Sequence, residues 1–276
     1  MTTQTPALPF PVTPRRPGEP EADLTGFTLI HRALRSGTRD LAVAASAIGA
    51  GAPCPAARRE AYVAFATEVL HEIHLHHTRE DDVLWPVIAA SAGAVVDLEP
   101  LTDDHTELHA VLARAEEALR AFGGAADVRS AAAPLGAVLT EMADLLDEHI
   151  VEEEAEVFPV IREHVSAKDF AACEKRFQRG SGPKHMMFVL PWVIGQCTPE
   201  ERAAALADAP APLKVLLRLG EGRWQAVAPS SSGLEPEKVR QSRAVRAAAI
   251  QSGLPVRSAT STAFLRCASA AVTSPR

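Results

Sequence analysis

One pattern that occurs twice limits the folds open to this chain. Each copy has a His, a Glu four residues later, and an aromatic residue followed by Pro near its end. The members are His76, Glu80, Trp85 and Pro86 in the first copy, and His149, Glu153, Phe158 and Pro159 in the second. Because four residues make about one α-helical turn, the His and Glu of each copy share a helix face. Two such faces, brought together, could make a metal site.

Hydrophobic periodicity predicts four long helices. Apolar or small residues recur at alternating steps of three and four positions in the ranges 24–48, 55–92, 99–122 and 130–165. Short segments containing Gly or Pro separate these ranges. Abundant Ala and an aromatic content of only 5% also favour helices over sheets. The sequence therefore predicts an all-α protein built on an antiparallel up-down four-helix bundle, with short extra C-terminal helices and a disordered tail.

Polar residues interrupt the apolar stripe of every predicted helix. In an antiparallel bundle, positions early in the first and third helices lie level with positions late in the second and fourth. The inward-facing polar residues that meet this condition are His31, His76, Glu80, His105, His149 and Glu153. Burial of two unpaired carboxylates would cost several kcal/mol each, and no Lys or Arg lies in the stripes to balance them. A pair of divalent metal ions would provide that balance.

The types of ligand narrow the choice of metal. Imidazole and carboxylate without thiolate suit iron or manganese, whereas structural zinc favours Cys. Two Glu on facing helices can bridge two ions about 3.5 to 4 Å apart. With two His for each ion, a position stays open for an oxygen ligand, which predicts chemistry with O₂, H₂O₂ or NO.

Two neighbouring residues compete with the first copy of the pattern. His77 and Asp81 are also one turn apart, and periodicity barely separates them from His76 and Glu80. The repeat selects His76 and Glu80. We therefore expect His77 to lie behind the ligands or at the surface.

Taken together, the motifs resemble the hemerythrin-like, or HHE cation-binding, domains. The matching pieces are 31–35, His76-His77 with Glu80-Asp81 and 84–86, Asp104-His105, and His149 with Glu153-Glu154 and Phe158-Pro159. The resemblance covers roughly residues 22–165. It implies a four-helix bundle that holds two non-haem iron ions (Fe²⁺/Fe³⁺), oxo- and carboxylate-bridged, with the six inward residues as ligands. A looser match around 190–192 and 212–218 resembles the tail of actinobacterial members.

The sequence departs from the hemerythrins that carry O₂. Those proteins use five His and two carboxylates, and here His109, four residues after His105, is the candidate fifth imidazole. The alternative for His109 is a polar residue at the edge of the bundle. The fourth helix carries His-x-x-x-Glu, which resembles the regulatory and peroxide-reactive branches. The resemblance thus implies binding or reduction of O₂, H₂O₂ or NO in sensing, detoxification or redox buffering, as a possible peroxide- or NO-reactive oxidoreductase.

Two other functions fit the same sequence. One is a non-catalytic, iron- or oxygen-responsive module that signals through its C-terminal segment. The other is a metal-free helical scaffold.

Some polar residues outside the six predicted ligands also have expected positions. We expect Glu156 to accept a hydrogen bond from a ligand or to be solvated with Glu152 and Glu154. We expect His164 and His185 to face solvent.

Composition bounds the partners and the location. A net charge of -7 argues against nucleic-acid binding, which needs a basic face. The longest apolar run, 186–194, is too short to span a bilayer, and the N-terminus lacks the layout of a signal peptide. Four scattered Cys suit a reducing compartment. We expect a cytoplasmic protein with small-molecule ligands and no membrane partner.

The domain organisation follows from the same patterns. The predicted parts are a disordered or extended Pro-rich N-terminus (1–20), the bundle (21–165), a helical appendage (166–228) and a disordered basic tail (229–276). Within the appendage, short helices are predicted at 167–178, 199–207 and 211–219, with a mixed apolar segment at 184–196. These helices are expected to cap or flank the bundle.

Overall fold

The computed structural model describes residues 8–207 and Leu217, and all regular structure in this part is helical. The elements are α1 (Thr25–Gly49), α2 (Ala56–Arg79), the π-helical η1 (Glu80–Leu84), α3 (Trp85–Ala92), the short η2 (Gly93–Val95), α4 (Glu99–Gly124), α5 (Val128–His164), α6 (Ala167–Gly180), α7 (Pro183–Ile194) and α8 (Pro199–Ala207). The all-α prediction is confirmed. The predicted helix at 211–219, apart from Leu217, and the tail from 229 lie outside the described residues.

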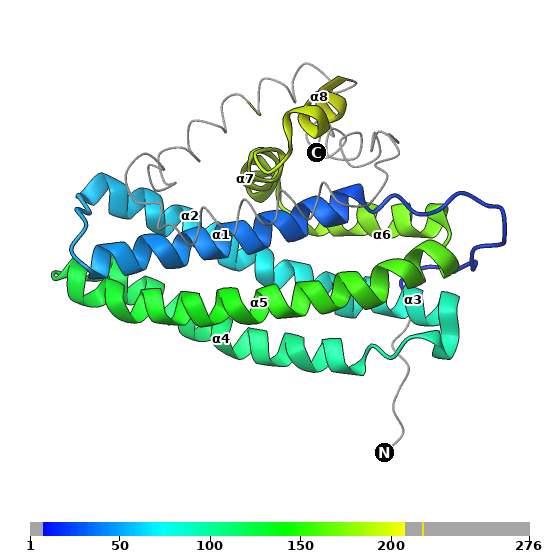
Figure 1. The fold of residues 1–276 in the computed structure, drawn as a ribbon, viewed down its shortest axis with the longest axis horizontal. Helices are drawn as coiled ribbons and strands as arrows, with labels where there is room; N and C mark the ends of the chain where they lie inside the picture. The colour runs from blue at the N-terminus through cyan, green and yellow to red at the C-terminus, as the bar shows by residue number, and fades with distance from the viewer. Residues whose placement is uncertain (1–7, 208–216, 218–276) are drawn as a thin grey trace.

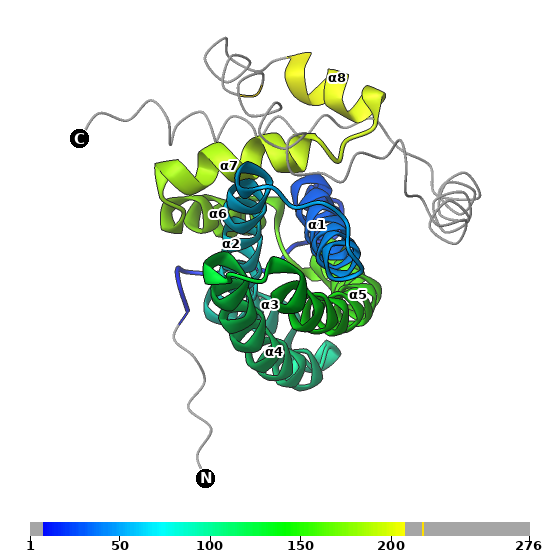
Figure 2. The same ribbon diagram turned by 90° about the vertical axis from the view of Figure 1, so that its left-hand side faces the viewer.

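Helices α1, α2, α4 and α5 form the predicted four-helix bundle. They lie side by side and alternate in direction along the chain (Figure 1). Seen from one end, they occupy four corners, with α1 and α4 each packed between α2 and α5 (Figure 2). No described helix is long and apolar enough to cross a bilayer.

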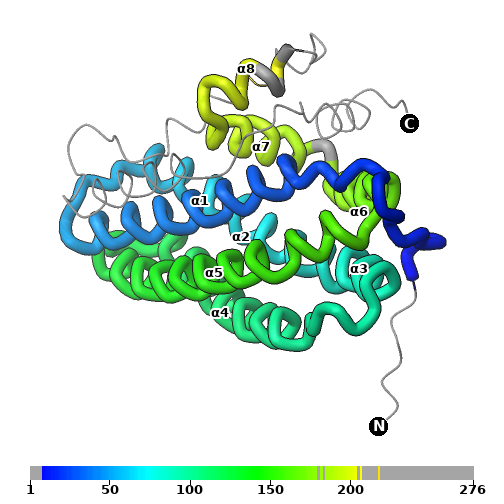
Figure 3. Tube along the Cα trace, turned by 45° about the vertical axis from the view of Figure 1, so that its right-hand side comes forward, coloured from blue at the N-terminus to red at the C-terminus, as the bar shows by residue number. Residues whose placement is uncertain are grey.

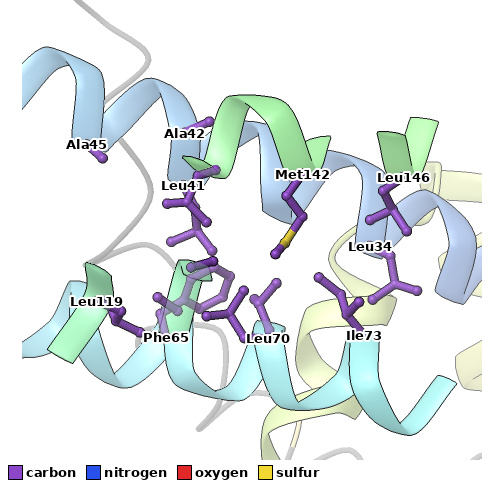
Figure 4. Packing of buried hydrophobic residues seen from close by; sticks show 14 of the residues in the cluster. Leu34, Leu41, Ala42, Ala45, Phe65, Leu70, Ile73, Leu119, Met142 and Leu146 are labelled. Atoms are coloured by element: carbon purple, nitrogen blue, oxygen red, sulfur yellow. The ribbon is translucent and has the colours of Figure 1, made fainter. Parts of the chain in front are cut away.

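The bundle interior consists of two apolar clusters with a polar layer between them. In the larger cluster, side chains from α1, α2 and α5 point toward one another, as Leu34, Ile73 and Met142 do in Figure 4. The smaller cluster lies toward the other end and includes Trp85 and Leu101. Along α2 and α4 the inward His and Glu fall between residues of the two clusters, while His31 of α1 and His149 of α5 lie at the end of the larger cluster that faces the smaller one. Burial of both clusters therefore fixes these polar residues at one level.

The second predicted helix is interrupted by a π-helical turn. The N–H of Trp85 donates to the carbonyl of Glu80, five residues earlier, where an α-helix would use four. Pro86 comes next, and in an α-helix its ring would clash with the carbonyl four residues before it, so the wider turn relieves this contact. As a result Val83, predicted to face inward, is only half-buried, while Leu84 is buried. The widened turn begins at a predicted metal ligand.

The N-terminal segment is ordered from residue 8, in contrast to the disorder predicted for 1–20. The N–H of Thr13 donates to the buried carboxylate of Asp169 at 2.8 Å, and the N–H of Arg15 donates to the carbonyl of His164 at 2.8 Å. Phe10 also packs against the smaller apolar cluster. Residues 8–20 therefore lie against the folded helices, where the backbone N–H groups of Thr13 and Arg15 and the ring of Phe10 find partners.

Helix α7 lies on one side of the bundle with α8 (Figure 3). It forms most of the mixed apolar segment predicted at 184–196, for which no helix was predicted, and its buried Trp192 packs against Gly37 of α1. A Cβ at Gly37 would lie 2.6 Å from Trp192 Cζ2, so α1 has no room for a side chain there.

His185 of α7 was predicted to face solvent, but it is buried between two carboxylates of α2. Its Nδ1 lies 2.7 Å from Glu68 Oε2, and its Nε2 lies 2.6 Å from Glu72 Oε2.

Candidate metal centre

Side chains from α1, α2, η1, α4 and α5 converge in the polar layer as two overlapping groups. The first group is His31, His76, Glu80 and Glu153, and the second is His77, Glu80, His105 and His149. Within each group, one nitrogen or oxygen atom per residue lies within 4.8 Å of all the others. All seven residues are buried, and Glu80 belongs to both groups.

Histidine pairs define two halves of this centre. His31 Nε2 lies 3.1 Å from His76 Nε2, and His105 Nε2 lies 3.1 Å from His149 Nε2. Two nitrogens about 2.1 Å from one ion, at close to a right angle, would lie about 3 Å apart. Each pair therefore has the spacing of two ligands on one ion.

The two carboxylates lie between the histidine pairs. Glu80 Oε1 is 3.0 Å from His76 Nε2, whereas Glu80 Oε2 is 3.5 Å from His105 Nε2. Glu153 Oε2 is 3.3 Å from His31 Nε2 and 4.0 Å from His149 Nε2. The two oxygens of Glu80 thus face opposite halves of the centre.

Unmet hydrogen-bonding groups support a cation at this place. Among the described residues, both carboxylate oxygens of Glu80 and of Glu153, and both ring nitrogens of His77, are buried without a hydrogen-bond partner. Burial of such groups without a partner is costly and rare in folded proteins. Metal coordination would satisfy the oxygens of both carboxylates and one ring nitrogen of His77, so the donor set fits a metal site.

The ionisation states agree with this interpretation. Burial, followed by the charge of neighbouring imidazoles, lowers the pKa values of His76 and His77 well below the usual range. Both rings therefore stay neutral, which is the form that binds metals. Burial and then the charge of Glu153 raise the pKa of Glu80 well above the usual range. A cation would reverse that shift, because it stabilises the carboxylate.

His31 differs from these two histidines. Burial lowers its pKa, but the nearby charge of Glu153, together with the charge of Glu154 and the contact of Glu154 with His31 Nδ1, more than offsets this effect and raises the pKa to about 9. Without a metal, a protonated His31 therefore partly balances Glu153. A bound ion would take over that role and displace the proton.

Three carboxylates hold ligand imidazoles from behind. The contacts are His31 Nδ1 with Glu154 Oε1 at 2.9 Å, His105 Nδ1 with Asp81 Oδ1 at 2.9 Å, and His149 Nδ1 with Asp104 Oδ2 at 3.3 Å. A carboxylate that accepts the Nδ1–H fixes the tautomer in which the Nε2 lone pair faces the centre. Such partners also make the imidazole a stronger metal ligand.

The repeat gave no role to these carboxylates. Glu156 is exposed, which agrees with the solvated alternative and not with the acceptor one, whereas Glu154, expected to be solvated, makes the contact. A sequence signal does exist, because each carboxylate is adjacent to a ligand of its own helix and contacts the His of another. Asp81 follows Glu80, Asp104 precedes His105, and Glu154 follows Glu153. Adjacency alone would also have selected Glu148 and Glu152, so it narrows the choice without settling it.

The structure brings together all six predicted ligands and adds His77 to them. The surface position considered for His77 is wrong, because this side chain is fully buried. Neighbouring residues of a helix point about 100° apart, so His76 turns toward α1 and His77 toward α4 and α5. The His77 ring centroid lies 4.4 Å from that of His105 and 5.3 Å from that of His149.

His109 is in neither group of ligand atoms. Its side chain is half-buried, and its ring centroid lies 6.1 Å from that of His77 and 5.3 Å from that of His74. His109 therefore lies at the edge of the polar layer, which was the alternative to a role as a ligand.

We predict that Asp81→Asn weakens metal binding about 10- to 100-fold, because His105 loses the carboxylate that orients its ring. Titration of the metal-free protein with Fe²⁺ under anaerobic conditions measures this change. The matched control is Asp82→Asn, since Asp82 is the next residue of η1 and is exposed. Equal affinities for the two variants would contradict the role of Asp81.

Comparison with known families assigns the chain to one of them. The family model described as Hemerythrin HHE cation binding domain matches residues 24–161, half of the 276-residue chain. No curated protein and no solved structure matches the chain. The matched range contains all seven residues of the two buried groups, which fit the cation binding of the family. The chain therefore belongs to the hemerythrin HHE cation-binding domain family.

Proposed function

We propose that this chain is a cytoplasmic non-haem di-iron protein that binds or reduces O₂, H₂O₂ or NO. The observation that carries the proposal is the position of Glu80, whose two oxygens face the two histidine pairs. A carboxylate shared in this way belongs to a centre of two ions rather than one. The absence of Cys from both groups favours iron over structural zinc.

Each residue of the centre would have its own role in binding the two ions. His31 and His76 would hold one ion, His77, His105 and His149 the other, and Glu80 and Glu153 would lie between the two. Two iron ions held close together supply a two-electron change to a small oxidant. Glu154, Asp81 and Asp104 would keep the imidazoles oriented, and the apolar clusters on both sides exclude bulk water.

The test is to load the purified chain with Fe²⁺ without air, then measure iron content and expose it to each oxidant. We expect about two iron ions per chain and a new visible absorption band after air. The rate of peroxide or NO consumption then separates turnover from simple binding. Less than about one iron per chain, with no absorption change, would refute the proposal.

A second candidate function is an iron-responsive module that signals through the C-terminal helices. Its support is Arg32, the neighbour of His31 in the sequence, whose guanidinium donates to Glu201 of α8 at 2.8 Å and to the carbonyl of Gln196 at 3.1 Å. A change at His31 could therefore reach α8 through one residue of α1. Limited proteolysis tests this function: iron removal should expose new cleavage sites after residue 166, while peroxide disappears no faster than with free iron.

A further inference from the structure

A pocket of about 80 Å³ opens beside the first half of the metal centre. Two of its buried lining residues, His76 and Glu80, belong to that centre. Its half-buried lining residues include Arg79, Phe177 and Gln178. The pocket therefore leads from partly exposed residues to two ligands of the first group.

Helices outside the matched family range build much of this pocket. Phe170 and Phe177 come from α6, and Met186 and Val189 come from α7, all beyond residue 161. Phe27 and Ile30 of α1 complete an apolar lining. Because α7 is anchored on α1 by Trp192, its side of the pocket is fixed in place.

The charged groups of the lining largely balance one another. One oxygen of Glu72 accepts from Arg79 at 2.8 Å and the other faces His185 Nε2 at 2.6 Å, while Arg79 also donates to the hydroxyl of Ser181. Burial, followed by the charge of Asp23, raises the pKa of Glu174 to about 7. Glu174 is therefore only partly ionised near pH 7, and Arg79 is paired with Glu72.

The size of the pocket restricts its ligand. A cavity of roughly 150 Å³ holds one benzene molecule, so about 80 Å³ leaves room for a molecule of only a few atoms. An apolar lining also disfavours a molecule that gives up strong hydrogen bonds with water on entering. H₂O₂ has such hydrogen bonds, whereas O₂ and NO have almost none.

We propose that this pocket binds an apolar diatomic gas, O₂ or NO, and conducts it to the half of the centre that contains His76 and Glu80. The role as a conduit rests on the proposed di-iron function, whereas the binding of an apolar guest does not. Helices α6 and α7 then select the ligand that reaches the family's metal site.

The first experiment tests the pocket alone. Xenon is a suitable probe because it enters dry apolar cavities. We expect a crystal of the full iron-loaded chain under xenon pressure to show xenon between Phe27, Phe177 and Val189. Xenon should be lost in Val189→Phe, which fills the pocket, and kept in Met187→Phe, a control on the same helix whose native side chain is exposed. No xenon in the unmodified protein would overturn the proposal.

The second experiment tests the conduit. In the reduced, iron-loaded protein, Val189→Phe should slow NO association about ten-fold or more at unchanged iron content, and slow the reaction with H₂O₂ much less. Phe177→Ala, which widens the half-buried side of the pocket, should speed NO association, and it tests the proposal even if Val189→Phe fails to fold.

The outcomes separate this proposal from the proposed function. Equal slowing of NO and H₂O₂, or an NO rate unaffected by both variants, would overturn the conduit. If xenon binds but the iron-loaded protein reacts with neither gas, the conduit fails whereas the apolar site stands. The proposed function fails as well only if H₂O₂ does not react either.

Discussion

Glu80→Gln is expected to stabilise the metal-free protein and to destabilise the iron-loaded one. Without metal, Glu80 is a buried carboxyl close to Glu153, with no hydrogen-bond partner for its oxygens among the described residues. A neutral amide avoids the cost of that buried acid, so we expect the free energy of unfolding to rise by about 1 to 3 kcal/mol. With iron present, the variant lacks the one ligand shared by both groups.

The loss in the iron-loaded protein follows from linkage. A metal that binds only the folded state, at a hundred times its dissociation constant, adds about 2.7 kcal/mol to stability. We expect Glu80→Gln to remove most of this contribution and to reduce the iron content from about two ions per chain to fewer than one. Chemical denaturation with and without Fe²⁺, together with iron analysis, measures both effects.

Glu156→Gln is the matched control, because Glu156 lies on α5 near the centre but is exposed. It should change stability by less than about 0.5 kcal/mol in both states. If the unmodified protein takes up no iron, and Glu80→Gln is more stable both with and without added Fe²⁺, the metal-free scaffold considered from the sequence would be favoured.

The long helices could be predicted because burial imposes one period along each of them. Periodicity places Leu24, Phe27, His31, Leu34, Thr38, Leu41, Ala45 and Ile48 on the inward face of the first helix. All eight are buried, seven of them within α1 and Leu24 at the residue before it. The π-helical turn at Glu80 was missed, since periodicity assumes a constant rise and twist. Helix α7 was missed because Pro191, inside a short apolar segment, argues against a helix, although near the C-terminal end of α7 it is tolerated.

The metal ligands were harder to predict than the helices, for a different physical reason. A stripe of inward positions describes one face, whereas a metal centre in the middle of a bundle draws on two faces of α2 at once. His76 reaches His31 on α1, and His77 stacks on His105 of α4. Contacts of this kind depend on how three helices rotate against each other. The sequence of one helix does not contain that information.

His77→Gln is therefore the variant that best separates the two interpretations of α2. If His77 is a ligand of the second group, its loss should weaken binding of one ion by more than about 100-fold and leave close to one iron per chain. If His77 lies behind the ligands without binding an ion, as we expected because the repeat selects His76, the iron content should stay near two ions per chain. Anaerobic Fe²⁺ titration with iron analysis measures the difference.

Two controls complete this test. His74→Gln changes an exposed His on the same helix, and it should bind iron like the unmodified protein. His76→Gln removes a ligand of the first group, and it should also lose one ion while leaving the second group intact. A double variant of His76 and His77 should then lose both ions. If His77→Gln matched His74→Gln in iron content, the second group would hold its ion through Glu80, His105 and His149 alone.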